Sequence, residues 1–273
     1  MADGDFKTRS SAGPVAGWLG SDRPAPHARV PGFETKREEA VATPHRRSSF
    51  LATAWLITRK DLLIEFRSRE VVYTTLFFAV SCVLVFAFSF VKEGVAVQDA
   101  AAGILWIAIA FSGTLALGRA FERERQNDTL RALMLTPADR PAVYVGKLVG
   151  VLALLAVVEA IVTPLIALMF GAPVFDHALL LAALLAAGTT GFAAVGTLFA
   201  AMLVRARSRD VLLPILLYPI TVPVIIAGVR GTAALLQPDA DEPMARAWLS
   251  MLVFFDVVFI TLALWTFEPV MTE

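Results

Sequence analysis

Long apolar runs without charge dominate the chain from residue 71 to its C-terminal region. Residues 71–91 read VVYTTLFFAVSCVLVFAFSFV and contain no charged side chain. An α-helix of this length rises about 31 Å, close to the thickness of the hydrocarbon core of a bilayer. Because no water in that core can satisfy the backbone polar groups, such a run has to form a spanning helix. We therefore expect an integral membrane protein.

The same criterion predicts an all-α protein with six membrane-spanning helices. They cover residues 71–91, 100–118, 145–170, 178–204, 211–229 and 247–267. The fourth is rich in glycine and alanine, and small residues let helices approach closely, so we place it centrally in the bundle. The fifth contains Pro214, Pro219 and Pro223. Because each proline removes a backbone donor, we expect this span to be kinked or broken.

The chain before the first span shows two other patterns. Residues 1–48 are rich in proline and glycine and poor in large apolar residues, so we expect a disordered cytoplasmic tail. Residues 49–70 carry apolar positions at helical spacing next to basic ones, which predicts a helix lying on the membrane surface. Its predicted stripe consists of Leu51, Trp55, Thr58, Leu62 and Phe66. Residues 49–273 would then form one membrane domain.

Basic residues mark one side of the predicted membrane domain. That side has Arg59, Lys60, Arg67, Arg69, Arg119, Arg123, Arg125, Arg131, Arg140, Lys147, Arg205, Arg207 and Arg209. The other side has Lys92, Arg230 and Arg246. Since basic loops are retained in the cytoplasm, we expect both termini to be cytoplasmic.

Composition narrows the possible functions. The chain is 57% hydrophobic and 18% charged, and its zero net charge gives no indication of a nucleic-acid partner. Cys82 is the single cysteine, which excludes a disulfide framework and a cysteine-rich metal site. No phosphate-binding glycine loop and no pattern of a hydrolase or metalloprotease is present, so we expect no catalytic activity. If transport by this chain is ATP-driven, another subunit has to carry the ATPase.

The loop at residues 118–147 has the most unusual pattern. Its first part is densely charged, and Leu130, Leu133 and Met134 follow at helical spacing before Pro137 ends the pattern. A short helix of this kind, fixed between two spans, is suited to bind a soluble partner. Alternatively, it is a basic cytoplasmic loop with no further role, and periodicity does not decide between the two.

Two acids interrupt the apolar spans. Glu159 lies in LLAVVEAIVTPLIAL and Asp256 in SMLVFFDVVFITL. Because a charge at the bilayer centre costs about 2.5–3.5 kcal/mol on insertion scales, such residues usually face the bundle interior or water. They could carry protons or ions, or they could tie helices together. We favour the structural role because the spans hold no evident basic partner.

Four stretches of the chain resemble the heme exporter protein B family, the permeases of the cytochrome c maturation ABC transporter. They are TRKDLLIEFRSRE (58–70), ALGRAFERERQNDTLRALMLTPADRPAVYVGKLVG (116–150), EAIVTPLIALMFG (159–171) and GTLFAAMLVRARSRDVLLPILLYPITVPVIIAGV (196–229). The resemblance covers about residues 50–273. It departs from the family pattern at Thr129, where glycine is common, and at Arg131, where glutamate is common.

The resemblance implies a six-span permease of the ABC-2 type with a cytoplasmic coupling helix that binds an ATPase. The coupling candidates are Glu122, Arg123, Glu124, Arg125, Asp128, Leu130, Arg131, Leu133 and Pro137. The candidates for intramembrane polar or gating roles are Glu159, Pro164, Pro214, Pro219 and Asp256.

The resemblance also implies partners and a location. The partners would be an ATP-binding subunit (component A) that holds ATP and Mg²⁺, a heme-handling membrane protein (component C), a small single-span protein (component D) and a periplasmic heme chaperone. The chain would lie in the bacterial inner membrane and have heme as the cargo of its complex. Because the possible heme ligands in the spans, Cys82, Tyr73, Tyr218 and a few methionines, form no evident pair, we expect it to bind no cofactor directly and heme to be held mainly by component C. Two alternatives stay open: an ABC-2 exporter of a lipid, drug or polysaccharide, and a proton-coupled carrier that uses Glu159 and Asp256.

Overall fold

A computed structural model describes residues 50–92, 95–96, 100–122, 140–204, 206–237 and 239–272, and the structural statements below concern these residues. The described elements are α2 (Phe50–Ser68), α3 (Glu70–Ser89), β1 (Val91–Lys92), β2 (Val95–Ala96), α4 (Ala101–Arg119), α7 (Arg140–Phe170), α8 (Ala178–Met202), α9 (Arg209–Leu236) and α10 (Glu242–Thr272). The two short strands pair antiparallel between α3 and α4. The expected tail, residues 1–48, lies outside the described residues.

Among the residues that the structure describes, six helices are long and apolar enough to cross a membrane, which confirms the predicted number of spans. They are Glu70–Ser89, Ala101–Arg119, Pro141–Phe170, Ala178–Met202, Arg209–Leu236 and Glu242–Phe267. The ends differ from the predicted ones mainly where a charge lies inside a helix. The fifth span continues past Arg230 and the sixth begins before Arg246, because helical hydrogen bonding does not stop at a single charged side chain.

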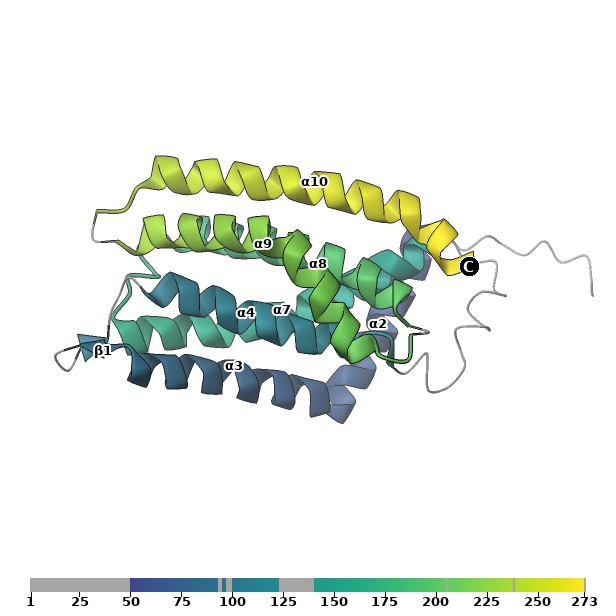
Figure 1. Cartoon of the computed structure of the whole chain (residues 1–273), viewed down its shortest axis with the longest axis horizontal. Coiled ribbons are helices and arrows are strands. Elements are labelled where there is room, and N and C mark those ends of the chain that lie inside the picture. Colours follow the sequence, from purple (N-terminus) through teal and green to yellow (C-terminus); the bar gives the residue numbers. More distant parts are fainter. Residues whose placement is uncertain are drawn as a thin grey trace, which may run out of the picture. The chain divides into compact units, whose positions relative to one another are not determined.

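Figure 1 shows these spans side by side, with α2 crossing near the end of the bundle where α3 begins. Helices α4 and α8 are the interior elements. In their most apolar 18-residue stretches, 67% and 56% of the residues are buried, against at most 33% in the other spans. Helix α4 packs on α3, α7, α8 and α9, and α8 packs on α4, α7, α9 and α10. The central position predicted for α8 is confirmed, and α4 shares it.

Helix α9 keeps its three prolines inside one continuous helix, so the fifth span is not broken. Figure 1 shows that α9 changes direction along its length, in agreement with the predicted kink. Between two of the prolines, the hydroxyl of Thr221 donates to the carbonyl oxygen of Leu217 at 2.9 Å. Such back-bonding often accompanies a bend in a helix.

The glycines of α8 and α9 make room for one large side chain. Trp106 of α4 is buried, and a Cβ atom on Gly188 or Gly228 would overlap its indole ring. The indole N–H donates to the Thr232 hydroxyl at 3.0 Å. The small residues therefore leave space for a tryptophan between α4, α8 and α9. We call this packing of Trp106 against Gly188, Gly228 and Thr232 the Trp106 seat.

Candidate functional site

The predicted partner-binding segment is described only at its two ends. Helix α4 ends at Arg119, the chain is described up to Glu122, and it resumes at Arg140 with α7. The other coupling candidates lie outside the described residues and stay predictions. They are Arg123, Glu124, Arg125, Asp128, Leu130, Arg131, Leu133 and Pro137. The structure does define how the first of these ends is held.

Lys147 holds the first end from inside α7. Its side chain is only 5% exposed, and its Nζ donates to the carbonyl oxygen of Ala120 at 2.9 Å. The same Nζ lies 2.9 Å from Oδ2 of Asp61 on α2 and 5.3 Å from the ring centroid of Phe121. The last carbonyls of a helix lack helical partners and carry partial negative charge, so a cation stabilises them. Lys147 is therefore a buried interhelical residue, whereas the charge pattern had assigned it to a loop.

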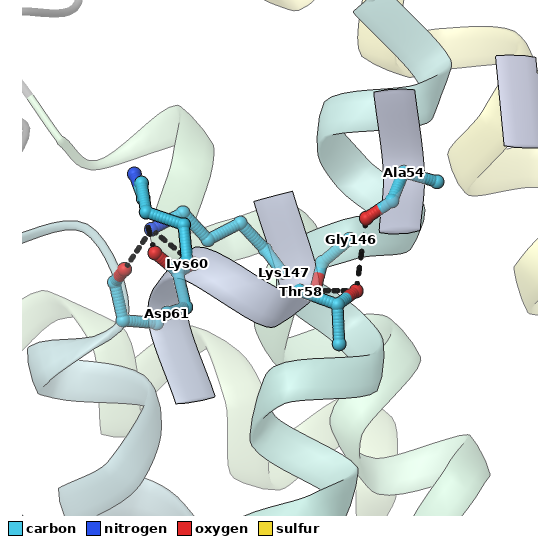
Figure 2. A network of polar contacts seen from close by, with 7 residues as sticks. Ala54, Thr58, Lys60, Asp61, Gly146 and Lys147 are labelled. Carbon is cyan, nitrogen blue, oxygen red and sulfur yellow. Dashed lines mark hydrogen bonds and ion pairs between the residues drawn. The ribbon is translucent and has the colours of Figure 1, made fainter. Parts of the chain in front are cut away.

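Helix α2 packs closely on α7 next to this lysine (Figure 2). The Thr58 hydroxyl lies 3.0 Å from the carbonyl oxygen of Ala54 and 3.1 Å from that of Gly146. A Cβ atom on Gly146 would come within 2.8 Å of the Ile57 side chain, so this contact requires glycine. Asp61 lies on the same side of α2, where it meets Lys147.

The predicted apolar stripe of α2 does not face one environment. Thr58 is buried against α7, whereas Leu51 and Trp55 of the same stripe are exposed. The face that packs on α7 centres on Ala54 and Thr58. This face is set by the close approach at Gly146, where the Ile57 side chain and the carbonyl oxygen of Ala54 lie against α7.

Arg209 holds the end of α4 from a third helix. It is the first residue of α9, only 1% exposed, and its Nη2 donates to the carbonyl oxygen of Leu117 at 3.0 Å. Its Nη1 lies 3.9 Å from Oε2 of Glu122. By its position in the chain Arg209 is one of several loop charges, and no local pattern distinguishes it from Arg205 or Arg207.

A more exposed ion pair joins α4 to α3. Arg119 Nη1 lies 3.0 Å from Oε1 of Glu70, and both side chains are about half exposed or more, at 48% and 69%. Exposed pairs of this kind contribute about 0–1 kcal/mol. With Lys147 and Arg209, this pair connects α2, α3, α7 and α9 to the residues where the chain leaves α4.

The two intramembrane acids approach α8 from different helices. The Thr189 hydroxyl of α8 donates to Oε1 of Glu159 on α7. Asp256 on α10 lies against Gly191, where an added Cβ atom would come within 2.6 Å of its Oδ1. That oxygen is buried and has no hydrogen-bond partner among the described residues. The two acids thus contact neighbouring parts of α8 from two different helices.

The proline candidates lie within helices. Pro164 is inside α7, and Pro214 and Pro219 are inside α9. A gating role for them stays a prediction. In the described part of the chain, no three His, Cys, Asp or Glu side chains are grouped so that they could hold a metal ion. We call residues 117–122, together with Lys147 and Arg209, the junction at the end of α4. The interactions available there are ion pairs and helix capping.

Comparison with known proteins covers both the junction and the spans. The model of the CcmB protein family matches residues 52–271. A heme exporter protein B of Pseudomonas aeruginosa is 27% identical over 182 residues, which are 67% of this chain and 81% of that protein. The one of Paracoccus denitrificans is 33% identical over 173 residues, or 59% and 75%. The Escherichia coli protein is 33% identical over 96 residues, or 35% and 44%.

Proposed function

Because this chain belongs to the CcmB protein family, we propose that it is the permease subunit of an ABC transporter in cytochrome c maturation. ATP hydrolysis by a partner subunit drives the export of heme, or its release to a periplasmic chaperone. The relatives carry the name heme exporter protein B, which supports heme as the cargo. This chain supplies the membrane path or the moving element and performs no catalysis itself.

The observation that supports coupling most directly is the junction at the end of α4. A partner that pushes on residues 123–139 acts on a segment whose first flank, the end of α4, is held by two buried cations, Lys147 and Arg209. Such a segment passes force into the bundle, because its ends cannot move independently of the helices that hold them. A ligand shifts an equilibrium only through its different affinity for two states, and ATP supplies that difference through the partner.

The proposal includes the partners and the orientation. The ATP-binding subunit, component A, holds ATP and Mg²⁺ and binds residues 122–137 on the cytoplasmic side. Component C handles heme, component D is a small single-span protein, and the chaperone receives heme in the periplasm. This chain crosses the bacterial inner membrane several times and has both termini in the cytoplasm, in accord with its basic loops.

Co-purification tests the coupling. The tagged chain, expressed with its ATP-binding subunit, should retain that subunit and its ATPase activity in detergent. Replacing Glu122 and Arg125 by alanine should reduce retention or ATPase stimulation about tenfold, as expected when a buried interface loses charged contacts. Arg207→Ala, at an exposed position of the same side, is the control and should leave both unchanged.

Two results would speak against this function. If the wild-type chain never retains an ATPase subunit, it is not an ABC permease. If the Glu122 and Arg125 variant assembles and hydrolyses ATP like the wild type, the docking segment is assigned wrongly. Retention of an ATPase that responds to a lipid, drug or polysaccharide but not to heme would instead favour the alternative ABC-2 exporter.

A further inference from the structure

We infer that Lys147 and Arg209 form a two-cation clamp on the C-terminal end of α4, which ties α2 and α9 to the start of residues 123–139. The clamp consists of these two cations, the carbonyl oxygens of Ala120 and Leu117, and the acids Asp61 and Glu122. Its role in transmitting force depends on the proposed function, whereas its mechanical role in the bundle does not.

The first step of the argument is the end of α4 itself. The carbonyl oxygen of Leu117 accepts Arg209 Nη2 at 3.0 Å, and that of Ala120 accepts Lys147 Nζ at 2.9 Å. The donors come from two other helices, α9 and α7. Helix ends usually receive such bonds from water or from nearby residues. Here the end of α4 is fixed from two sides by parts of the chain that are distant in sequence.

Burial separates these cations from ordinary cytoplasmic loop charges. Lys147 is 5% exposed and Arg209 is 1% exposed. A loop charge that only sets membrane orientation can stay in water, where it costs nothing to solvate. Burying a cation is expensive unless it is paired and hydrogen-bonded. The contacts of both cations with the end of α4 and with the two acids therefore account for their burial.

The acids extend the clamp to α2. Asp61 is 22% exposed and contacts Lys147 Nζ at 2.9 Å (Figure 2). Next to it, the Thr58–Gly146 contact brings the backbones of α2 and α7 close together. A displacement of the α4 end therefore pulls on Lys147 and, through it, on Asp61 and α2.

The clamp changes which helices a partner can move. The segment 123–139 is covalently joined to α4 and α7 only. The polar contacts of Lys147 and Arg209 add α2 and α9, so one push at the surface reaches four helices. One of them is α9, which carries the proline kink.

Hydrogen–deuterium exchange of the full-length chain in lipid nanodiscs tests the clamp without any partner. Lys147→Met and Arg209→Met should each speed exchange of residues 118–122 by about tenfold or more, because local opening controls exchange. Lys147→Met should also speed exchange of residues 54–62 in α2. Lys147→Arg, which keeps a cation, should restore most of the protection.

Two further variants keep the test decisive. Asp61→Asn combined with Lys147→Met removes both charges of the pair, which avoids leaving an unpaired buried charge. It should fold and still exchange faster in α2. Glu70→Gln, at the exposed pair with Arg119, is the matched control and should exchange like the wild type. Unchanged protection in the charge-free double variant, or equal effects in the control, would overturn the clamp.

A second readout concerns transmission. In the assembled complex, the double variant should keep the ATPase subunit and its basal ATP hydrolysis. Its ATP-driven heme release should fall about tenfold, a change that lies within the usual range for coupling between two sites. Full release by a variant whose α2 exchanges fast would overturn transmission through α2. Failure of the proposed function shows differently, because the wild-type complex would then release no heme in response to ATP while the exchange results stand.

Discussion

At the scale of single residues, the contact between Glu159 and Thr189 tests whether an intramembrane acid ties two helices together. The Thr189 hydroxyl is buried and donates to Glu159 across α7 and α8. Interhelical hydrogen bonds in membranes contribute about 0.6 kcal/mol on average and up to about 1.7 kcal/mol. We expect a coupling energy in this range from a double-mutant cycle of Glu159→Gln and Thr189→Val, measured by unfolding in mixed micelles.

The matched control for this cycle is the next residue of α8. Thr190 is more exposed, and its hydroxyl bonds to the carbonyl oxygen of Ala186 in its own helix. Thr190→Val should therefore show no coupling to Glu159→Gln.

The same glutamine variant separates two functions, since a proton-coupled carrier would lose transport while an ABC permease would still assemble with its ATPase. Loss of ion-driven transport with normal assembly would favour the carrier.

Sequence and structure differ most at this scale. Spacing along the chain places Lys147 and Arg209 among loop charges, because each has other basic residues nearby. Their partners are 27 and 92 residues away, at Ala120 and Leu117. A single sequence does not contain such long-range pairings. The resemblance to a family suggested the coupling candidates, which stay predictions, but it could not indicate the residues that hold the end of α4.

At the scale of helices, the Trp106 seat gives a prediction about packing. Gly228→Ala should lower stability by about 1–3 kcal/mol, as overpacking does in well-packed interiors. Gly103→Ala is the control within α4, because an added Cβ atom there meets nothing within 4 Å. It should be neutral or stabilising, since alanine is the better helix former. Thermal unfolding in detergent measures both, and equal effects would contradict the seat.

Helices were the part of the fold that the sequence predicted best. A span is recognisable because the bilayer requires about 20 apolar residues in a row, whatever the neighbours are. The central position of α8 followed from its small residues. The burial of α4 was not predicted, although α4 holds five alanines and three glycines, because we applied the small-residue argument only to the fourth span.

At the scale of the whole molecule, the proposed orientation can be tested with single cysteines. In a Cys82→Ser background, Asp239→Cys and Arg207→Cys lie at exposed positions of turns at opposite ends of the spans. An impermeant maleimide should label position 239 in intact spheroplasts and position 207 only after permeabilisation, because basic loops stay in the cytoplasm. Phe254→Cys, in the middle of α10, should stay unlabelled in both. The reverse pattern at 207 and 239 would contradict the orientation.

The Trp106 seat also limits how α4 can move as a whole. The indole fixes the helix near its first turns, whereas the carbonyl of Ala120 lies about 21 Å further along, at 1.5 Å per residue. If α4 is held at Trp106 and displaced at its C-terminal end, it tilts as a rigid body about the position of Trp106. A sideways displacement of about 2 Å at the pushed end then tilts the rod by only about 5° over that length. Such a tilt displaces the N-terminal end of α4, at the opposite membrane face, only slightly. Any large opening of the bundle at that face therefore has to come from the helices that pack on α4.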